Sequence, residues 1–251
     1  MMKRKSLRKL ISGVISLILL VSISNNAYAF PAFVDDIPDP VYGIDKNVPW
    51  YAQAVYDLWY AHVADASRTD EEGFVLYEPA RAITRGQFLS FLGHLAKECG
   101  KEVEKESAGD LTTKDCLNWA VKNHIAYGKG NGLAENDTLT RQEMAVFLKR
   151  FAEYIGFELE DTNTLSDYEQ LVDSDKVAPW AKESLQYAHR YRIMVGEKYS
   201  DGSIAMNPRR IVTRAEAAQA IYNYTKSAHF ELPFYAGLMH GDIAIPASAE
   251  F

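Results

Sequence analysis

Apolar residues recur at i, i+3, i+4 and i+7 in three segments of this chain, and each segment opens on the same kind of four-residue phrase. The phrase reads Thr-Arg-Gly-Gln at 84–87, Thr-Arg-Gln-Glu at 140–143 and Thr-Arg-Ala-Glu at 213–216. The apolar spacing is typical of an amphipathic helix that buries one face. The chain is therefore expected to contain an internal repeat, with three equivalent helices that share one core.

The first and last residues of each phrase predict how its helix starts. A Thr followed three residues later by Glu or Gln forms a capping box, in which both side chains bond backbone N–H groups left open in the first turn. Apolar residues flank each phrase at the spacing of a hydrophobic staple. The expected capping residues are Thr84, Gln87, Thr140, Glu143, Thr213 and Glu216.

A second helical segment and a loop precede each of these helices. Residues 117–128 align with 185–196 without gaps, whereas the first copy has a longer, acidic loop at 66–79. We therefore expect an all-α fold, with three helix-loop-helix repeats in a pseudo-threefold arrangement around a central three-helix bundle. The expected segments are a signal peptide at 1–29, repeats at 30–105, 106–160 and 161–228, and a C-terminal tail at 229–251.

The first 29 residues are typical of a secretory signal peptide. Five basic residues precede an apolar stretch from Leu10 to about Ser24, and Ala27-Tyr28-Ala29 supplies small residues before Phe30. The stretch is shorter than the ~20 apolar residues that comfortably cross a bilayer. Its removal leaves 22 basic residues against 34 acidic ones, a net charge of −12. Such a charge disfavours nucleic acid and anionic membranes as partners.

Catalytic motifs are missing from the sequence, which holds no Gly-x-Ser-x-Gly, His-Glu-x-x-His or phosphate loop. Adjacent carboxylates such as Glu71 and Glu72 rarely face one cleft, as glycoside hydrolysis requires. We therefore expect no enzyme. Two cysteines, Cys99 and Cys116, could form a disulfide or stay free. With scattered histidines, they indicate no metal site, and no cofactor is expected.

Capping does not explain the arginine in each phrase. A cation in the first turn faces the positive end of the helix dipole, at a cost of roughly 0.3 to 1 kcal/mol when exposed. Arg85, Arg141 and Arg214 therefore indicate one of two things. Each binds an anionic ligand at the helix start, or each forms a salt bridge to an acidic residue of the next repeat. The residues alone leave both open.

Four aromatic residues near the upstream helices are candidates for stacking on a sugar, although aromatic residues on a helix usually belong to the core. They are Trp50, Trp119, Trp180 and Tyr187. The second copy has Thr112 where the first and third have Trp.

These features together resemble S-layer homology repeats. The resemblance covers the chain from Phe33 to about Ser227 and is closest between Trp180 and Tyr224. It rests on Phe33-Val34-Asp35, its weaker echo Leu165-Ser166-Asp167, Trp180-Ala181, the turn Asp201-Gly202 and the Thr-Arg-Ala-Glu phrase.

The resemblance implies a secreted protein held non-covalently on a Gram-positive-type cell wall or in its S-layer. Such repeats bind a secondary wall polysaccharide bearing ketal-linked pyruvate, with the arginine of the Thr-Arg motif as a ligand-binding residue. Because the first phrase ends in Gln, we expect Arg141 and Arg214 to be the better candidates and Arg85 to have drifted. The alternative is a surface assembly or adhesion protein that uses the repeats, and residues 229–251, for protein contacts.

Overall fold

The three segments with helical spacing form helices that begin directly after the Thr of each phrase. They are α3 (Arg85–Glu98), α5 (Arg141–Ile155) and α8 (Arg214–Ser227). At the start of α5 the Thr140 hydroxyl accepts the N–H of Glu143, whose carboxylate accepts the N–H of Thr140 at 3.0 Å. The same reciprocal pair opens α3 and α8, so all three helices satisfy first-turn N–H groups in one way.

The computed structural model describes residues 37, 48–69, 71, 75–130, 132–161, 168 and 170–233. The chain divides into two units, Met1–Phe30 and Pro31–Phe251, and every described residue belongs to the second. The expected signal peptide, the motifs at 33–35 and 165–167 and the tail beyond residue 233 lie outside the described residues.

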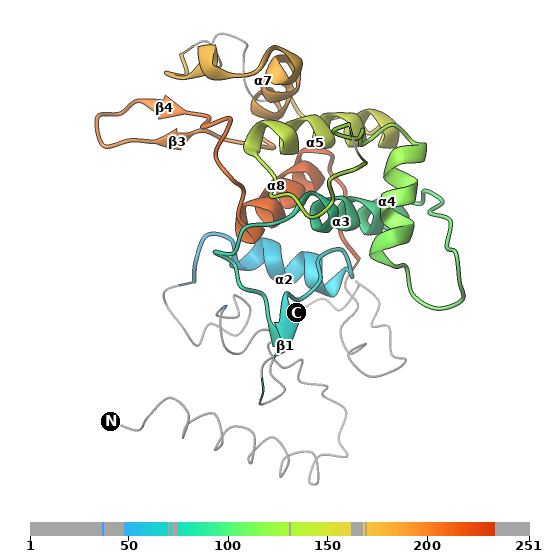
Figure 1. Cartoon of the computed structure of the whole chain (residues 1–251). Helices are drawn as coiled ribbons and strands as arrows, with labels where there is room; N and C mark the ends of the chain where they lie inside the picture. Colours follow the sequence, from blue (N-terminus) through green and yellow to red (C-terminus); the bar gives the residue numbers. More distant parts are fainter. Residues whose placement is uncertain are drawn as a thin grey trace, which may run out of the picture. The chain divides into compact units, whose positions relative to one another are not determined.

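Three further helices precede the loops, and short strands pair within two of those loops. The helices are α2 (Ala52–Tyr60), α4 (Thr113–Lys122) and α7 (Lys182–Arg190), with 3-10 turns η1 (Ser174–Lys176) and η2 (Pro179–Ala181) before α7. The antiparallel pairs are β1 (Arg68–Thr69) with β2 (Val75–Leu76) and β3 (Glu197–Lys198) with β4 (Ile204–Ala205). The expected all-α class was therefore too strict, because the described chain is helix-rich with small strand pairs (Figure 1).

The loop before α8 forms a hairpin because its turn residues suit one. Gly202 has a φ of 87°, a conformation that side chains disfavour, and the Asp201 carboxylate accepts the N–H of Ser203 at 2.9 Å. The sequence analysis noted this turn but not the strands on either side of it.

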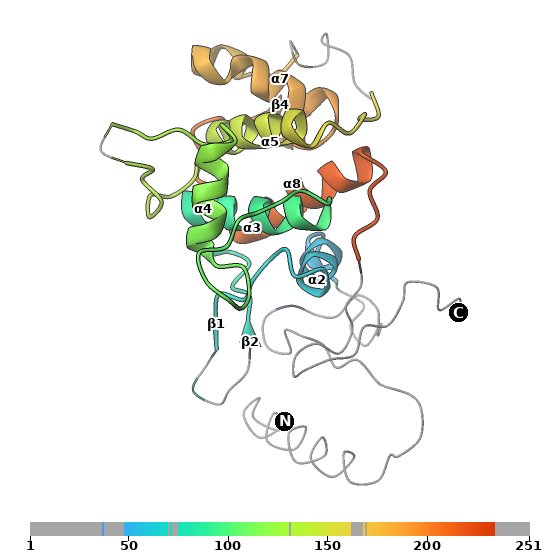
Figure 2. The ribbon, with the colours of Figure 1, turned by 90° about the vertical axis from the view of Figure 1, so that its right-hand side faces the viewer.

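Each upstream helix packs on a capped helix from a different expected repeat. Helix α4 packs on α3, α7 packs on α5, and α2 packs on α8, as both ribbon views show (Figures 1 and 2). Aromatic side chains join the capped helices to one another. Phe88 of α3 stacks on Phe147 of α5 at 6.5 Å, and Phe151 of α5 meets Tyr224 of α8 edge-on at 5.4 Å between ring centroids. The core is thus continuous across all three segments.

Three buried apolar residues just before the phrases form a closed circuit of backbone hydrogen bonds. Ile83 donates to the carbonyl of Val212 at 3.0 Å, Val212 donates to Leu139 at 2.8 Å, and Leu139 donates to Ile83 at 3.1 Å. All three side chains are fully buried. The circuit brings together helix starts that lie more than fifty residues apart in the sequence.

The contact between α3 and α4 depends on a glycine. A Cβ at Gly93 would lie 2.6 Å from the Cys116 Sγ and 2.7 Å from its Cβ, well inside normal contact distance. We predict that Gly93→Ala lowers the free energy of unfolding by about 1 to 3 kcal/mol, because α4 must move outward. Urea denaturation measures the change, and unchanged stability would contradict this account of the helix contact.

Candidate ligand-binding cavities between helix starts

The three phrase arginines are buried, with 3%, 7% and 1% exposure for Arg85, Arg141 and Arg214. Each guanidinium reaches out of its own repeat and donates to backbone carbonyls of another loop. The acceptors are Leu133 and Tyr127 for Arg85, Met206 and Val195 for Arg141, and Tyr77 and Asp65 for Arg214. The arginines therefore connect the three segments to one another.

The backbone N–H groups beside these arginines are also occupied. Arg141 donates its backbone N–H to the carbonyl of Arg210 at 3.0 Å, and Gln142 donates to Pro208 at 2.8 Å. Residues 85 and 86 donate in the same way to the loop before α5, and residues 214 and 215 donate to the loop before α3, at 79–81. Protein carbonyls thus fill the positions that an anion would take at a free helix N-terminus. They also account for the cation in the first turn.

Two of the arginines form ion pairs with the capping glutamate of the next phrase. Arg85 Nη1 lies 3.0 Å from Glu143 Oε1, and Arg141 Nη1 lies 3.7 Å from Glu216 Oε1. Burial acts to raise the pKa of Glu143, but hydrogen bonds from Lys129 and Thr140 hold that pKa below its ordinary value. The pKa of Glu216 is lowered in the same way, mainly by Arg210. Both carboxylates are charged at neutral pH.

Arg214 has a different environment. The corresponding position in the first phrase is Gln87, which brings no charge, and the Arg214 guanidinium lies over the rings of Tyr77 at 4.5 Å and Phe91 at 5.6 Å. Burial lowers the pKa of Arg214, and the carbonyls and rings around it offset the loss of water. The first phrase thus has no charged capping residue, whereas Arg85 is paired with the carboxylate of Glu143.

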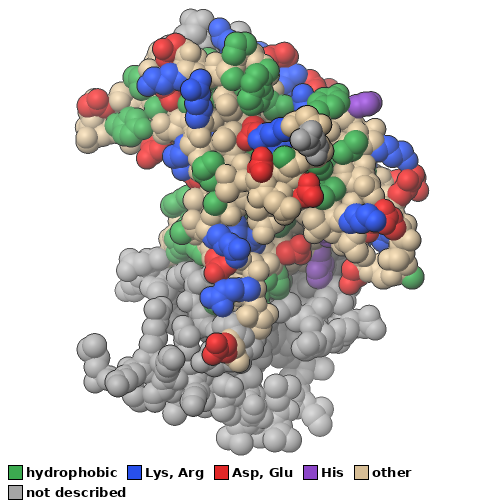
Figure 3. All heavy atoms as spheres, in the orientation of Figure 1, with side chains coloured by type: hydrophobic (Ala, Val, Ile, Leu, Met, Phe, Trp, Pro, Cys, Tyr) green, Lys and Arg blue, Asp and Glu red, His purple; other side chains and the backbone are tan. Residues whose placement is uncertain are grey.

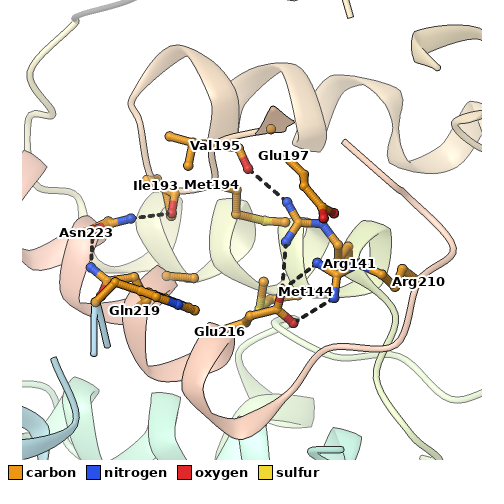
Figure 4. A pocket seen from close by; sticks show the side chains of 13 residues that line it. Arg141, Met144, Ile193, Met194, Val195, Glu197, Arg210, Glu216, Gln219 and Asn223 are labelled. Carbon is orange, nitrogen blue, oxygen red and sulfur yellow. Dashed lines mark hydrogen bonds and ion pairs between the residues drawn. The ribbon is translucent and has the colours of Figure 1, made fainter. Parts of the chain in front are cut away.

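A cavity of about 500 Å³ lies beside Arg141, and we call it the Trp50 cavity. Its lining includes Trp50, Arg141, Met144, Val195, Arg210 and Glu216. Figure 4 shows the Glu216 carboxylate between the Arg141 and Arg210 guanidinium groups, while Asn223 bonds the carbonyl of Ile193. The cavity thus combines charged groups, an amide and apolar side chains, a mixture typical of small-molecule sites.

A second cavity, of about 370 Å³, lies beside Glu143, and we call it the Trp180 cavity. Its lining includes Lys129, Asp137, Gln142, Glu143, Trp180 and Ile211. Lys129 Nζ lies 2.6 Å from Glu143 Oε1 and 3.8 Å from Asp137 Oδ2. Both cavities therefore hold a capping glutamate, an additional cation and a tryptophan from an expected repeat other than that of the glutamate.

The four aromatic candidates differ in exposure. Trp50 and Trp180 are 64% and 59% exposed and line the two cavities. Trp119 is 3% exposed and packs edge-on against Phe151 and Tyr154, so the hypothesis that it stacks on a sugar was wrong. Half-buried Tyr187 packs on Tyr191 at 4.7 Å and lines neither cavity.

The structure adds functional and structural residues that the sequence analysis missed. Lys129 and Arg210 complete the charge networks, although neither belongs to a phrase. Thr112, noted only as a missing tryptophan, caps α4 in a fourth capping box with Asp115. The buried Asp173 accepts the N–H groups of Met206 and Asn207 at 2.8 and 2.7 Å. A Thr-x-x-Asp search would have found the fourth box.

Both cysteines are free thiols, so the disulfide alternative does not apply. Burial raises the pKa of Cys116 to about 12, which leaves its thiol protonated at neutral pH. Among the described residues, no group of three or more His, Cys, Asp or Glu side chains is placed to hold a metal ion. Within the same residues, no helix has the length and apolar character needed to cross a membrane.

Residues 171–218 match the S-layer homology domain, so the chain carries such a domain in its third segment. The match opens at Leu171-Val172-Asp173 and not at the proposed echo, 165–167. The chain is similar to an endoglucanase of Bacillus sp. (strain KSM-635), 29% identical over 70% of this chain and 18% of the relative. It is 28% identical to exoglucanase XynX of Acetivibrio thermocellus, over 70% of this chain and 16% of that protein.

The chain is also 30% identical to the surface-layer 125 kDa protein of Lysinibacillus sphaericus, over 57% of this chain and 12% of the relative. It thus spans less than a fifth of the length of these relatives. The domain and the surface-layer relative support attachment at the bacterial cell surface as the general role of the chain.

These relatives correct the expectation that the chain is not an enzyme. Two of them are an endoglucanase and an exoglucanase, so the absence of familiar catalytic motifs was insufficient ground for that exclusion. The matched parts are 18% and 16% of those proteins, and their activities are therefore not transferred to this chain.

The buried arginines generate a stability prediction. Arg141→Met removes the donors to the carbonyls of Met206 and Val195, and we expect the free energy of unfolding to fall by about 2 to 4 kcal/mol. Arg209→Met, at an exposed neighbouring cation, is the control and should change stability by about 0.5 kcal/mol or less. Equal stability of the two variants in urea denaturation would show that Arg141 does not hold the segments together.

Proposed function

We propose that this chain attaches non-covalently to the bacterial cell wall by binding a secondary wall polysaccharide that bears ketal-linked pyruvate. The Trp50 and Trp180 cavities are the proposed binding sites. The observation that carries the proposal is the pairing, in both cavities, of an open indole face with an exposed cation. An indole stacks on the apolar face of a sugar ring, and a cation binds a carboxylate.

We also propose that the chain contains three S-layer homology repeats in a pseudo-threefold arrangement, with α3, α5 and α8 at the centre. The closed circuit of Ile83, Val212 and Leu139 supports this arrangement. So does the rule that each phrase arginine reaches the loop of the following segment, with Arg214 returning to the first. In such a ring each of the three segments contacts the next one, and we propose one groove at each of these three contacts.

The three grooves are not equally suited to a ligand. Beside Arg214 the capping residue is Gln87, and the position occupied by tryptophan in the other grooves is Thr112. We therefore propose that the grooves beside Arg85 and Arg141 bind the polysaccharide and that the groove beside Arg214 has lost this capacity. The sequence analysis ranked Arg85 last because its own phrase ends in Gln87. In the proposed arrangement Gln87 belongs to the groove beside Arg214, so that groove takes the last place instead.

The test compares purified wall polysaccharide before and after chemical removal of its pyruvate. We expect the protein to bind native polysaccharide and to lose most affinity for the depyruvylated form. We expect Trp50→Ala combined with Trp180→Ala to weaken binding to native polysaccharide by about tenfold or more, because both stacking faces are lost. Calorimetric titration measures both effects.

Tyr199→Ala is the matched control, because Tyr199 is an exposed aromatic residue in the turn between β3 and β4 that lines neither cavity. It should bind like the unaltered protein. Binding to walls stripped of the polysaccharide, unaffected by the tryptophan changes, would contradict the proposal and favour a surface-assembly role through protein contacts.

A further inference from the structure

A further cavity, of about 410 Å³, lies beside α4, and we call it the Tyr154 cavity. None of its lining residues lines the Trp50 cavity or the Trp180 cavity. Its volume falls within the range of roughly 300 to 1,000 Å³ that small-molecule sites occupy. The residues used below are Glu102, Asn118, Trp119, Lys122, Asn123 and Tyr154, all of which line it.

The outer wall of the Tyr154 cavity is the segment 102–106, which hydrogen bonds fix to α4. The buried carboxylate of Asp115 accepts the N–H of Thr112 at 3.0 Å and the N–H of Glu106 at 2.9 Å. Asn118 Nδ2 in turn donates to Glu106 Oε1 at 2.9 Å. The capping residue of α4 therefore also holds this wall, and the cavity keeps its form without a ligand.

Several polar side chains in this cavity have hydrogen-bonding capacity that the protein leaves unused. Asn118 and Asn123 both donate their Nδ2 groups to protein oxygens at 2.9 Å. Within the described residues, their Oδ1 atoms accept no hydrogen bond, and neither the Glu102 carboxylate nor the Tyr154 hydroxyl forms one. These side chains therefore offer acceptors, together with one hydroxyl that can also donate.

The indole N–H of Trp119 is a buried donor without a partner. Trp119 is 3% exposed, and its Nε1 has no hydrogen-bond partner in the described part of the chain. Edge-on contacts with Phe151 and Tyr154 hold the ring, at 6.3 and 5.6 Å between centroids. A buried donor left unpaired costs about 1 to 3 kcal/mol. An acceptor that entered the cavity and bonded this N–H would remove that cost.

The unused groups favour a ligand that both donates and accepts hydrogen bonds. The free amide and carboxylate oxygens need donors, whereas the Trp119 indole needs an acceptor. A hydroxyl group supplies both functions. A ligand with several hydroxyl groups therefore matches the lining better than one with a single kind of polar group.

The charges around the cavity disfavour an anionic ligand. Three carboxylates line it, those of Glu102, Glu104 and Glu106. Lys122 is paired with Glu104, and Lys105 Nζ donates to a backbone carbonyl. At the right of Figure 3, where Figure 1 places α4, basic and acidic side chains lie next to one another. An acidic group would thus meet unpaired negative charge without a free cation to balance it.

We propose that the Tyr154 cavity binds an uncharged sugar ring. One hydroxyl of the sugar accepts the N–H of Trp119, and others donate to the Oδ1 atoms of Asn118 and Asn123 and to the Glu102 carboxylate. Trp119 thus contributes its N–H and not a stacking face. Because this cavity shares no lining residue with the other two, the proposal does not depend on binding of a pyruvylated polysaccharide.

The test follows the four indole N–H signals of the ¹⁵N-labelled chain by NMR, after assignment by triple-resonance experiments. Glucose, galactose and mannose are titrated in turn. At least one should shift the Trp119 signal with a dissociation constant on the order of 1 mM, since a single ring forms few hydrogen bonds. The matching uronate, which replaces one CH₂OH group by a carboxylate, should bind at least about tenfold more weakly because the glutamates repel it.

Tyr154→Phe combined with Glu102→Ala removes two of the proposed partners and leaves the hydrogen bonds of the wall intact. This double variant should bind the sugar about tenfold more weakly. Tyr127→Phe is the matched control, because Tyr127 is an exposed tyrosine that does not line the cavity. It should bind like the unaltered protein. Thermal unfolding of each variant should also match the unaltered protein, which separates a lost contact from a lost fold.

Three results would overturn the proposal. The first is a Trp119 signal that none of the neutral sugars shifts. The second is a uronate that binds as tightly as its neutral sugar, and the third is a folded double variant with unchanged affinity. The Trp50 and Trp180 signals report on the other two cavities, so the proposed wall-binding function is read separately in the same spectra.

Discussion

The structure depends on contacts that each segment makes with the next one around a closed circuit. Buried backbone groups must find hydrogen-bond partners, and here Ile83, Val212 and Leu139 supply them to one another across the chain. The arginine that follows each circuit residue extends the same connection to a neighbouring loop. Because the last segment bonds to the first, the described chain cannot lose one segment without leaving buried donors and acceptors unpaired.

The cavities are a consequence of that circuit. Arg141 fixes the loop around Val195 and Met206, and the same contact sets Glu216 between two guanidinium groups. Trp50 then completes the cavity from a part of the chain some ninety residues earlier than Arg141. A ligand in this cavity would touch three segments that are distant in sequence, so binding and closure of the circuit favour each other by linkage.

The sequence predicted the local features and missed those that depend on which segments meet. The Thr and Glu spacing was sufficient to locate the starts of α3, α5 and α8, because a capping box is formed by neighbours in the chain. The aromatic pattern could not separate Trp119, which packs on Phe151, from Trp180, which faces solvent, because both lie near upstream helices. The sequence did not show that Lys129 pairs with Glu143, because the pairing depends on the distance between two separate segments. It also did not show which groove Gln87 affects, because this depends on the order in which the segments contact one another.

Hydrogen exchange of three backbone amides tests the closed circuit most directly. The N–H groups of Ile83, Leu139 and Val212 should exchange with one free energy, equal to that of global unfolding, because none can open alone. In the Arg141→Met variant, the account predicts faster exchange at all three positions. Ile83 is included although its N–H donates to Val212 and not to a residue that the Arg141 side chain bonds. Faster exchange at Leu139 and Val212 with full protection kept at Ile83 would contradict it, since the segments would then be independent units.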